Sequence, residues 1–301
     1  PCFLFITVIT GRISRKVNWS YSISRIEMKS FLIICIILGG LLALWLFLIA
    51  PRMQRPKALF QLKKWKFAHR GLHNIEKGIP ENSLLAFQLA RDRGFAMELD
   101  VHLSRDGKLV VEHDDSLRRT CGVNAIIEES NWETLRSLHL EGTNERLPLL
   151  EEVFRLIDGK VPLLIEVKVF RGNQDRLCRT LWQQLQHYDG LYCVEAFDPR
   201  ALLWFRRHAP HVVRGQLAAY VRRGGAKIAP ILDFAVRNLW VNVLSRPDFV
   251  AYNYQDRHNL SFQLCRRLFK TPVFFWTIRS PEGATLARRS KASPIFEEIE
   301  L

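Results

Sequence analysis

The residue types best suited to chemistry lie in two short segments about 30 positions apart. The first contains His69 and Arg70, and the second contains Glu98, Asp100 and His113. An imidazole can transfer protons near neutral pH, carboxylates bind hard divalent cations, and a guanidinium binds phosphate oxygens. Together these residues indicate attack on a phosphate ester with the help of a divalent metal ion.

The second segment alternates strictly between polar and apolar residues. This alternation predicts a strand in which Glu98, Asp100 and His102 share one face. A Ser-Arg-Asp-Gly turn signal follows, and then an apolar run that predicts a returning strand. Symmetric pairing about the centre of that turn would place Glu98 opposite His113 and Asp100 opposite Val111. A hairpin with one face in solvent would alternate in the same way, so the hairpin alone leaves both interpretations open.

A third segment, 161–169, is almost wholly apolar apart from Glu166 and Lys168. Such a run is typical of a strand that is buried on both faces, as in a parallel sheet. Two charges on one face of a buried strand are costly unless each has a partner. A metal ion for Glu166 and a phosphate for Lys168 would be such partners, and a structural ion pair at the strand end is the alternative.

Eight motifs occur in the order and spacing of the glycerophosphodiester phosphodiesterase family, which the chain resembles over roughly residues 66–299. The resemblance implies a (β/α)8 TIM barrel that hydrolyses glycerophosphodiesters to sn-glycerol 3-phosphate and an alcohol. It also implies one divalent cation, Ca2+ or Mg2+. The motifs are His69-Arg70-Gly71, Pro80-Glu81-Asn82-Ser83, Glu98-Leu99-Asp100-Val101, Asp106-Gly107, His113-Asp114-Asp115, Ile165-Glu166-Val167-Lys168, Ala196-Phe197-Asp198-Pro199 and Trp276-Thr277.

The resemblance carries roles over to the five residues that would perform the reaction. His69 and His113 match the family's catalytic histidines, which act as general acid and base. Glu98, Asp100 and Glu166 match its metal ligands. The residues alone do not indicate which histidine is the base in which step.

Four further positions match residues that contact the substrate in the family. Arg70 and Lys168 correspond to the positions that neutralise the phosphate. Glu81 corresponds to the acid that orients Arg70 or lies near the metal, and Trp276 to an aromatic residue that lines the substrate pocket. The chain departs from the family at its last strand, which we expect to be short or irregular.

Apolar runs that alternate with helical periodicity support this barrel, because a βαβ pattern indicates a parallel sheet. We expect the helices near 83–93, 149–157, 174–187, 200–208, 231–239, 260–269 and 281–289, with a short extra helix over 131–138. We expect the strands over 66–70, 96–103, 162–169, 191–197, 212–218, 249–254, 273–278 and 293–297.

An uncharged apolar run of 19 residues, Phe31–Ile49, precedes the barrel and is long enough to span a bilayer. A cleaved signal peptide is the rival interpretation, but its apolar region is usually shorter and ends at a small-residue cleavage site. We therefore expect a single transmembrane helix. The expected organisation is an upstream or non-native extension over 1–27, an anchor over 28–52, a basic linker over 53–65 and the barrel domain over 66–301.

Basic residues are more frequent after this run than before it when the chain is taken to start at Met28. The positive-inside rule then predicts a single-pass membrane protein with its catalytic domain in the cytoplasm. The net charge of +14 fits contact with anionic lipid headgroups, so the lipid bilayer is the expected partner and nucleic acid is not.

Two alternative functions remain at this point. The first is a phospholipase D-like hydrolase that takes lysophospholipids in place of water-soluble glycerophosphodiesters. The second is a non-catalytic membrane scaffold, which the intact cluster of histidines and carboxylates disfavours because a scaffold has no need for it.

Overall fold

The chain forms two compact units, residues 1–47 and 48–301, and the computed structural model describes residues 27–224 and 229–299. The described part of the first unit belongs to the helix Glu27–Ile49, which has the length and apolar composition needed to cross a membrane. A signal sequence would have the same properties. The predicted extension over 1–27 lies, except for its last residue, outside the described residues.

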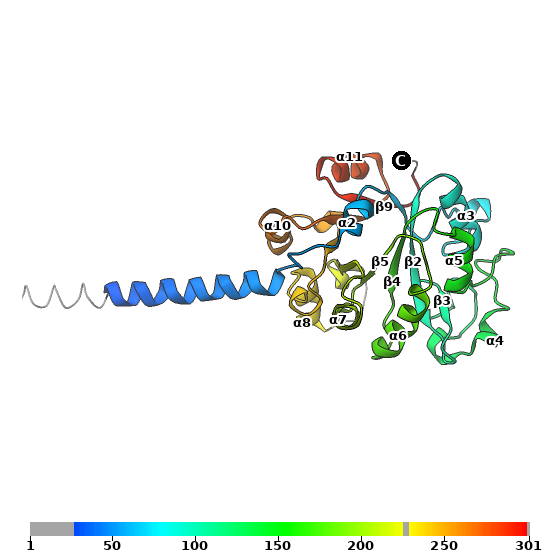
Figure 1. Cartoon of the computed structure of the whole chain (residues 1–301), viewed down its shortest axis with the longest axis horizontal. Helices are drawn as coiled ribbons and strands as arrows, with labels where there is room; N and C mark the ends of the chain where they lie inside the picture. The colour runs from blue at the N-terminus through cyan, green and yellow to red at the C-terminus, as the bar shows by residue number, and fades with distance from the viewer. Residues whose placement is uncertain (1–26, 225–228, 300–301) are drawn as a thin grey trace, which may run out of the picture. The chain divides into compact units, whose positions relative to one another are not determined.

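Eight parallel strands close into a barrel in the second unit, which confirms the predicted fold class. The strands follow one another around the barrel in chain order, and the last one pairs with the first. Figure 1 shows β2, β4 and β5 side by side, in agreement with their pairing. The eight strands are β1 Phe67–Ala68, β2 Ala96–Leu103, β4 Leu163–Val167, β5 Tyr192–Ala196, β6 Arg214–Ala218, β7 Phe249–Asn253, β8 Val273–Ile278 and β9 Ser293–Phe296.

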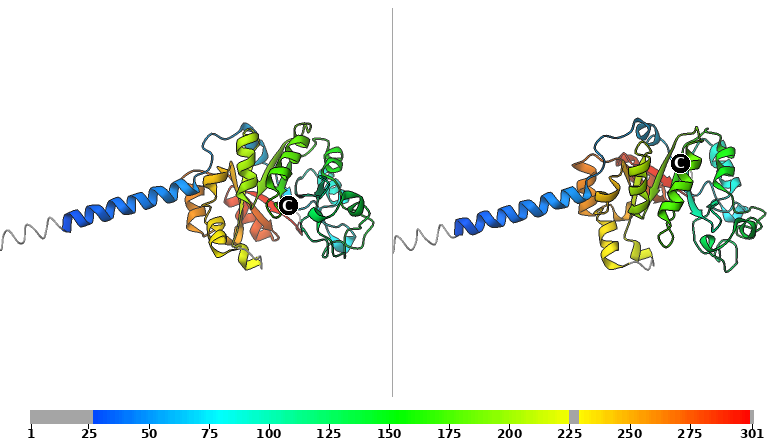
Figure 2. Two further views of the ribbon diagram at one scale, coloured as in Figure 1. Left: turned by 90° about the horizontal axis from the view of Figure 1, so that it is seen from below. Right: turned by 60° about the horizontal axis from the view of Figure 1, so that its bottom comes forward.

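Helices lie outside the strands in both views of Figure 2. Side chains fix where several of them begin: the Ser83 hydroxyl accepts a hydrogen bond from the backbone of Ala86 at the start of α3. Proline occupies the first turn of α7 behind Asp198 and of α11 behind Ser280. The helices are α2 Lys57–Leu62, α3 Leu84–Asp92, α4 Trp132–Leu135, α5 Leu150–Ile157, α6 Gln174–Leu185, α7 Pro199–His208, α8 Pro230–Arg237, α9 Asn242–Ser245, α10 Leu260–Arg267 and α11 Pro281–Arg289.

The predicted hairpin exists, but its predicted register is wrong by one residue. β3, Leu109–Val111, runs antiparallel to β2 and pairs Val111 with Val101 rather than with Asp100. The reason is the turn, in which the backbone of Ser104 bonds that of Lys108 and leaves three residues between them. Gly107 completes this turn at φ +87°, a backbone conformation that favours glycine.

An insert follows β3 and has a small apolar core of its own. It includes the 3-10 helix Ile127–Glu129 and α4, and its core contains Leu117, Ile127 and Leu135. These side chains are fully buried. The insert therefore gives the loop just after β3, which carries His113, a packed support.

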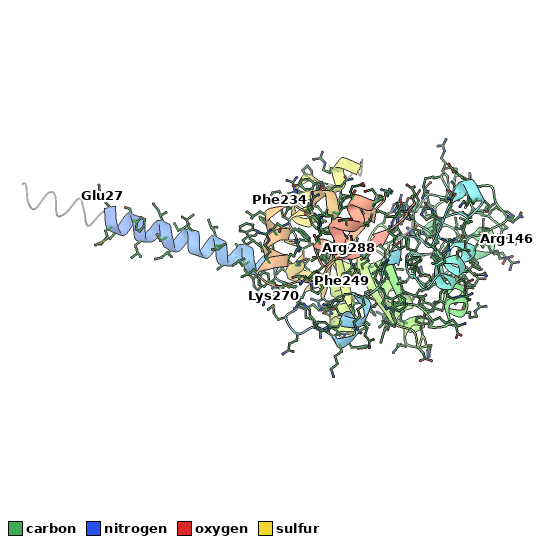
Figure 3. All side chains as sticks on the ribbon, turned by 90° about the horizontal axis from the view of Figure 1, so that it is seen from above. Glu27, Arg146, Phe234, Phe249, Lys270 and Arg288 are labelled. Carbon is green, nitrogen blue, oxygen red and sulfur yellow. The ribbon has the colours of Figure 1, made fainter. Side chains whose placement is uncertain are left out.

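The barrel interior away from the site residues is filled by apolar side chains. Figure 3 labels Phe249 among the strands, where it is fully buried, and the exposed residue Arg146 at the periphery. Leu59 and Leu62 of α2 belong to the same buried cluster as Phe249. Part of the predicted linker, 53–65, therefore packs against the core of the barrel.

Candidate active site

Three carboxylates meet inside the barrel, where β2 and β4 are neighbours. Asp100 and Glu166 are register partners, and Glu98 lies two residues before Asp100 on the same face of β2. One oxygen from each carboxylate lies within 4.8 Å of the others, and the exposed fractions of Glu98, Asp100 and Glu166 are 2%, 0% and 8%. The structure therefore brings together all three residues that the sequence predicts as metal ligands.

The electrostatics of this cluster favour a cation. Burial, with the neighbouring charges of Asp100, Glu166 and Glu195, raises the pKa of Glu98 well above its usual value. Burial also acts to raise the pKa of Asp100, but Lys168, His113 and Arg70 outweigh it and hold that pKa well below its usual value. A set of three buried carboxylate oxygens fits a hard divalent ion, which would polarise a phosphoryl oxygen.

Lys168 and Arg70 lie against these carboxylates. The ammonium group of Lys168 is 2.8 Å from both Asp100 and Glu166. The Arg70 backbone N–H donates to Glu98 at 3.1 Å, and its guanidinium lies 3.6 Å from Asp100. Both side chains are only 15% exposed, so the site holds two positive charges where a phosphate would meet the ion.

The loop after β1 depends on a glycine, Gly71, and on the buried side-chain amide of Asn82. A Cβ on Gly71, which has φ +81°, would lie 2.8 Å from the backbone of Ala86, so a larger residue would displace α3 or the loop. Asn82 is fully buried and donates to the carboxylate of Asp100 at 2.8 Å. The motifs around positions 69–71 and 80–83 therefore serve to hold Arg70 and Asp100 in place.

His69 follows β1 and is held by a carboxylate from the far end of the chain. Its Nδ1 is hydrogen-bonded to Glu297, just beyond β9, and its Nε2 lies 3.9 Å from Glu98. Burial lowers the pKa of His69 to about 4, although Glu297 acts in the opposite direction. The imidazole is consequently neutral at pH 7 and can accept a proton.

His113 follows β3 and is held differently. Its Nδ1 lies 2.5 Å from Asp114, which accepts a hydrogen bond of 2.7 Å from Arg119. Arg119 also donates to Glu81 at 2.7 Å, and Glu81 accepts from Arg70 at 2.8 Å. A chain of alternating charges thus connects His113 to the guanidinium beside the carboxylates.

Two cavities share His113, Glu166 and Phe197 in their walls. The first has a volume of about 260 Å3 and is lined by His69, Arg70 and Trp276, among others. The second has a volume of about 440 Å3 and includes Lys168, Phe170 and Asp198 in its wall. His113 lies in both walls, whereas His69 lies only in the first, so both imidazoles reach the smaller cavity.

The nine site residues predicted from the sequence fall into one region. Each of them lines one of these two cavities or bonds to a residue that does. The prediction from the sequence did not include four charged residues of the same region, namely Asp114, Arg119, Glu195 and Glu297. Asp114 lies in a quoted motif, and Glu195 is a lone charge on a buried strand, which is a signal of the kind that marked Glu166.

Several curated proteins are similar to this chain in sequence. The glycerophosphodiester phosphodiesterase of Caldanaerobacter subterraneus subsp. tengcongensis is 31% identical over 168 residues, 52% of this chain and 67% of that protein. A lysophospholipase D of Rattus norvegicus is 35% identical over 178 residues, 54% of each chain. The chain thus spans between about half and two thirds of the length of these relatives.

Solved structures share the fold. A phosphodiesterase of Oleispira antarctica, in complex with the product sn-glycerol-3-phosphate, has a TM-score of 0.64 at 21% identity, over 79% of this chain and 94% of its own. A glycerophosphodiester phosphodiesterase of Thermotoga maritima has a TM-score of 0.58 at 26% identity, over 76% and 92%. The profile of the Glycerophosphoryl diester phosphodiesterase family matches residues 69–296, and the chain belongs to that family.

Proposed function

We propose that this protein hydrolyses glycerophosphodiesters to sn-glycerol 3-phosphate and an alcohol, with Ca2+ or Mg2+ held by Glu98, Asp100 and Glu166. The observation that carries this proposal is the buried acidic cluster, which shares a cavity wall with two imidazoles that are each hydrogen-bonded to their own carboxylate. The bound ion would supply charge neutralisation at the phosphoryl oxygen.

The chain's own residues divide the remaining work. Arg70, fixed by Glu81, and Lys168 bind the phosphate oxygens. His69, neutral at pH 7, accepts a proton from the water molecule that attacks phosphorus, and His113 donates a proton to the alcohol whose bond to phosphorus breaks. Trp276 forms a wall of the cavity on the His69 side. An oxygen nucleophile and a protonated leaving group together make the displacement feasible near neutral pH.

The test uses the full chain purified in detergent, with glycerophosphocholine as substrate and Ca2+ or Mg2+ added. We expect release of glycerol 3-phosphate, which EDTA stops and either ion restores. Retention of full turnover after EDTA treatment and dialysis would contradict the metal assignment. No turnover with either ion, from protein that binds the ion, would favour the non-catalytic scaffold.

Lysophospholipids are the second candidate substrate class. The rat relative is named as a lysophospholipase D, and the apolar helix Glu27–Ile49 would bring the barrel close to lipid. This class would be favoured if the protein released choline from lysophosphatidylcholine in mixed micelles as fast as it hydrolyses glycerophosphocholine.

We also propose that residues 28–52 anchor the protein in a membrane as a single pass, with the barrel domain of 66–301 in the cytoplasm. The length and apolarity of the helix and the basic residues after it support this proposal. The protein should stay with membranes after alkaline carbonate extraction, and the barrel should resist protease added outside intact cells. A soluble, shortened chain would instead indicate a cleaved signal sequence.

A further inference from the structure

Glu195 is a buried carboxylate that the proposed reaction does not use. It lies on β5 as the register partner of Glu166 and is 1% exposed. Lys168 forms ion pairs with Asp100 and Glu166, whereas no ion pair joins Glu195 to any residue of the described part of the chain. One of its carboxylate oxygens is buried without a hydrogen-bond partner among these residues. An unpaired buried acceptor of this kind is costly and indicates a missing partner.

The side chain of Glu195 lines the cavity of about 260 Å3 that also contains His69. It lies outside the group of three carboxylates whose oxygens approach within 4.8 Å of one another. The cavity wall combines apolar groups, among them Phe197 and Leu217, with polar groups, among them Asn253 and Gln255. One oxygen of Glu195 has no partner among the described residues and is therefore open to a donor on a molecule bound in this cavity.

Trp276, in the same cavity wall, narrows the chemical class of that molecule. Its indole Nε1 is a donor that is also buried without a partner in the described residues. A hydroxyl group is the simplest group that can donate to one protein atom and accept from another. The cavity wall thus presents one acceptor and one donor to the hydroxyl groups of a bound molecule.

We infer that Glu195 accepts a hydrogen bond from a free hydroxyl of the glycerol moiety and so determines specificity for substrates that retain this hydroxyl. This inference rests on the proposed function and adds a residue to it. An ester oxygen at the same place could not donate and would leave the carboxylate unpaired. Sites built to hydrogen-bond a hydroxyl reject analogues without it strongly for this reason.

The test compares two phosphate monoesters by calorimetry on the full chain in detergent with saturating Ca2+. sn-Glycerol 3-phosphate carries free hydroxyls, and ethyl phosphate does not. We expect the wild-type protein to bind sn-glycerol 3-phosphate about 10- to 100-fold more tightly, as for a hydrogen bond to a charged group. Glu195→Leu and Glu195→Ala should lower this ratio to within a few-fold of one, since only the donor of Trp276 remains, and Glu195→Gln, which keeps an acceptor oxygen, should retain much of it.

A separate Ca2+ titration distinguishes recognition of a hydroxyl from binding of the ion. Glu195→Leu and Glu195→Ala should leave the Kd for Ca2+ within about threefold, since Glu195 is not one of the three ligands. Equal binding of the two esters by the wild type, or a loss of Ca2+ affinity in Glu195→Gln, would overturn the inference. Wild-type protein that prefers sn-glycerol 3-phosphate but does not hydrolyse glycerophosphocholine would refute the proposed function and leave the role of Glu195 in place.

Discussion

The two imidazoles of the site lie in contrasting surroundings. The side chain of His69 is 14% exposed and is hydrogen-bonded to Glu297 at the end of the barrel's last strand. The side chain of His113 is 34% exposed and depends on Asp114 and Arg119 in the insert after β3. The barrel itself thus fixes one imidazole, and a network of surface charges fixes the other. His69 should therefore tolerate substitutions of the residues around it better than His113.

Removal of either imidazole should have the largest effect. We expect His69→Ala and His113→Ala each to lower kcat/KM for glycerophosphocholine by about 10²- to 10⁴-fold, because each transfers a proton in the reaction. With bis(4-nitrophenyl) phosphate, whose leaving group needs no proton, His113→Ala should lose much less than His69→Ala. Equal losses on both substrates would contradict the division of roles, and circular dichroism would check that the variants are folded.

The next effect concerns Glu112, which lies beside His113, and the pH dependence of the free energy of unfolding. The carboxylate of Glu112 accepts a hydrogen bond of 3.0 Å from the backbone of His113, and burial, with the charge of Glu81, raises the pKa of Glu112 to about 7. Between pH 4.5 and 7 the folded chain therefore binds more protons than the unfolded chain, and the free energy of unfolding falls as the pH rises, by about 3 kcal/mol.

Glu112→Gln should remove this contribution, because the amide does not titrate. As the pH rises from 4.5 to 8, the free energy of unfolding of the variant should increase by about 3 kcal/mol relative to that of the wild type. Urea unfolding followed by tryptophan fluorescence measures this difference. Glu151→Gln, at an exposed position of α5, is the matched control and should leave the pH dependence unchanged. A variant that follows the wild-type curve would show that Glu112 is ionised throughout in the folded protein.

Arg119 tests the charge network directly. Arg119→Ala removes the bridge between Asp114 and Glu81, and we expect kcat/KM to fall about 10-fold as His113 and Arg70 lose orientation. A double-mutant cycle with Asp114→Asn should give a coupling energy of about 0.5–3 kcal/mol. The exposed pair Arg155 and Glu151 offers a control. Arg155→Ala should leave kcat/KM unchanged, and it should change neither the effect of Arg119→Ala nor that of Asp114→Asn. Additive effects of Arg119 and Asp114 would mean that the network does not act as a unit.

The smallest effect should come from the corresponding arginine on the His69 side. Arg279 is paired with Glu297, but its side chain is 55% exposed. Since the strand end already fixes Glu297 beside His69, we expect Arg279→Ala to lower kcat/KM by about two- to threefold. A loss as large as that of Arg119→Ala would remove the contrast between the two sides.

Much of the barrel could be predicted from the sequence, because strand alternation and apolar runs are local signals. The ranges of β2 and β8 agree with the prediction, and β9 is short, with a register shift in its pairing to β8, as expected. The register of β3 could not be predicted by symmetry, because it depends on the conformation of a three-residue turn at Gly107.

The supporting groups of the site were harder to predict than its metal ligands. Glu297 meets His69 across 228 positions of sequence, and only closure of the barrel brings them together. Arg119 lies in an insert without periodicity, where no local pattern tells a bridging arginine from a solvated one. Glu195 could have been found, because a single charge on a buried strand requires the same explanation as Glu166.

The connected charges from His113 through Asp114, Arg119 and Glu81 to Arg70 also constrain how this protein can change over evolution. A substitution at any one of these positions alters the surroundings of the next, so its effect depends on which residues occupy the others. Substitutions in the loop after β1 and in the insert after β3 should consequently occur together in related proteins. A chimaera that exchanges only one of them with a relative should be less active than a chimaera that exchanges both.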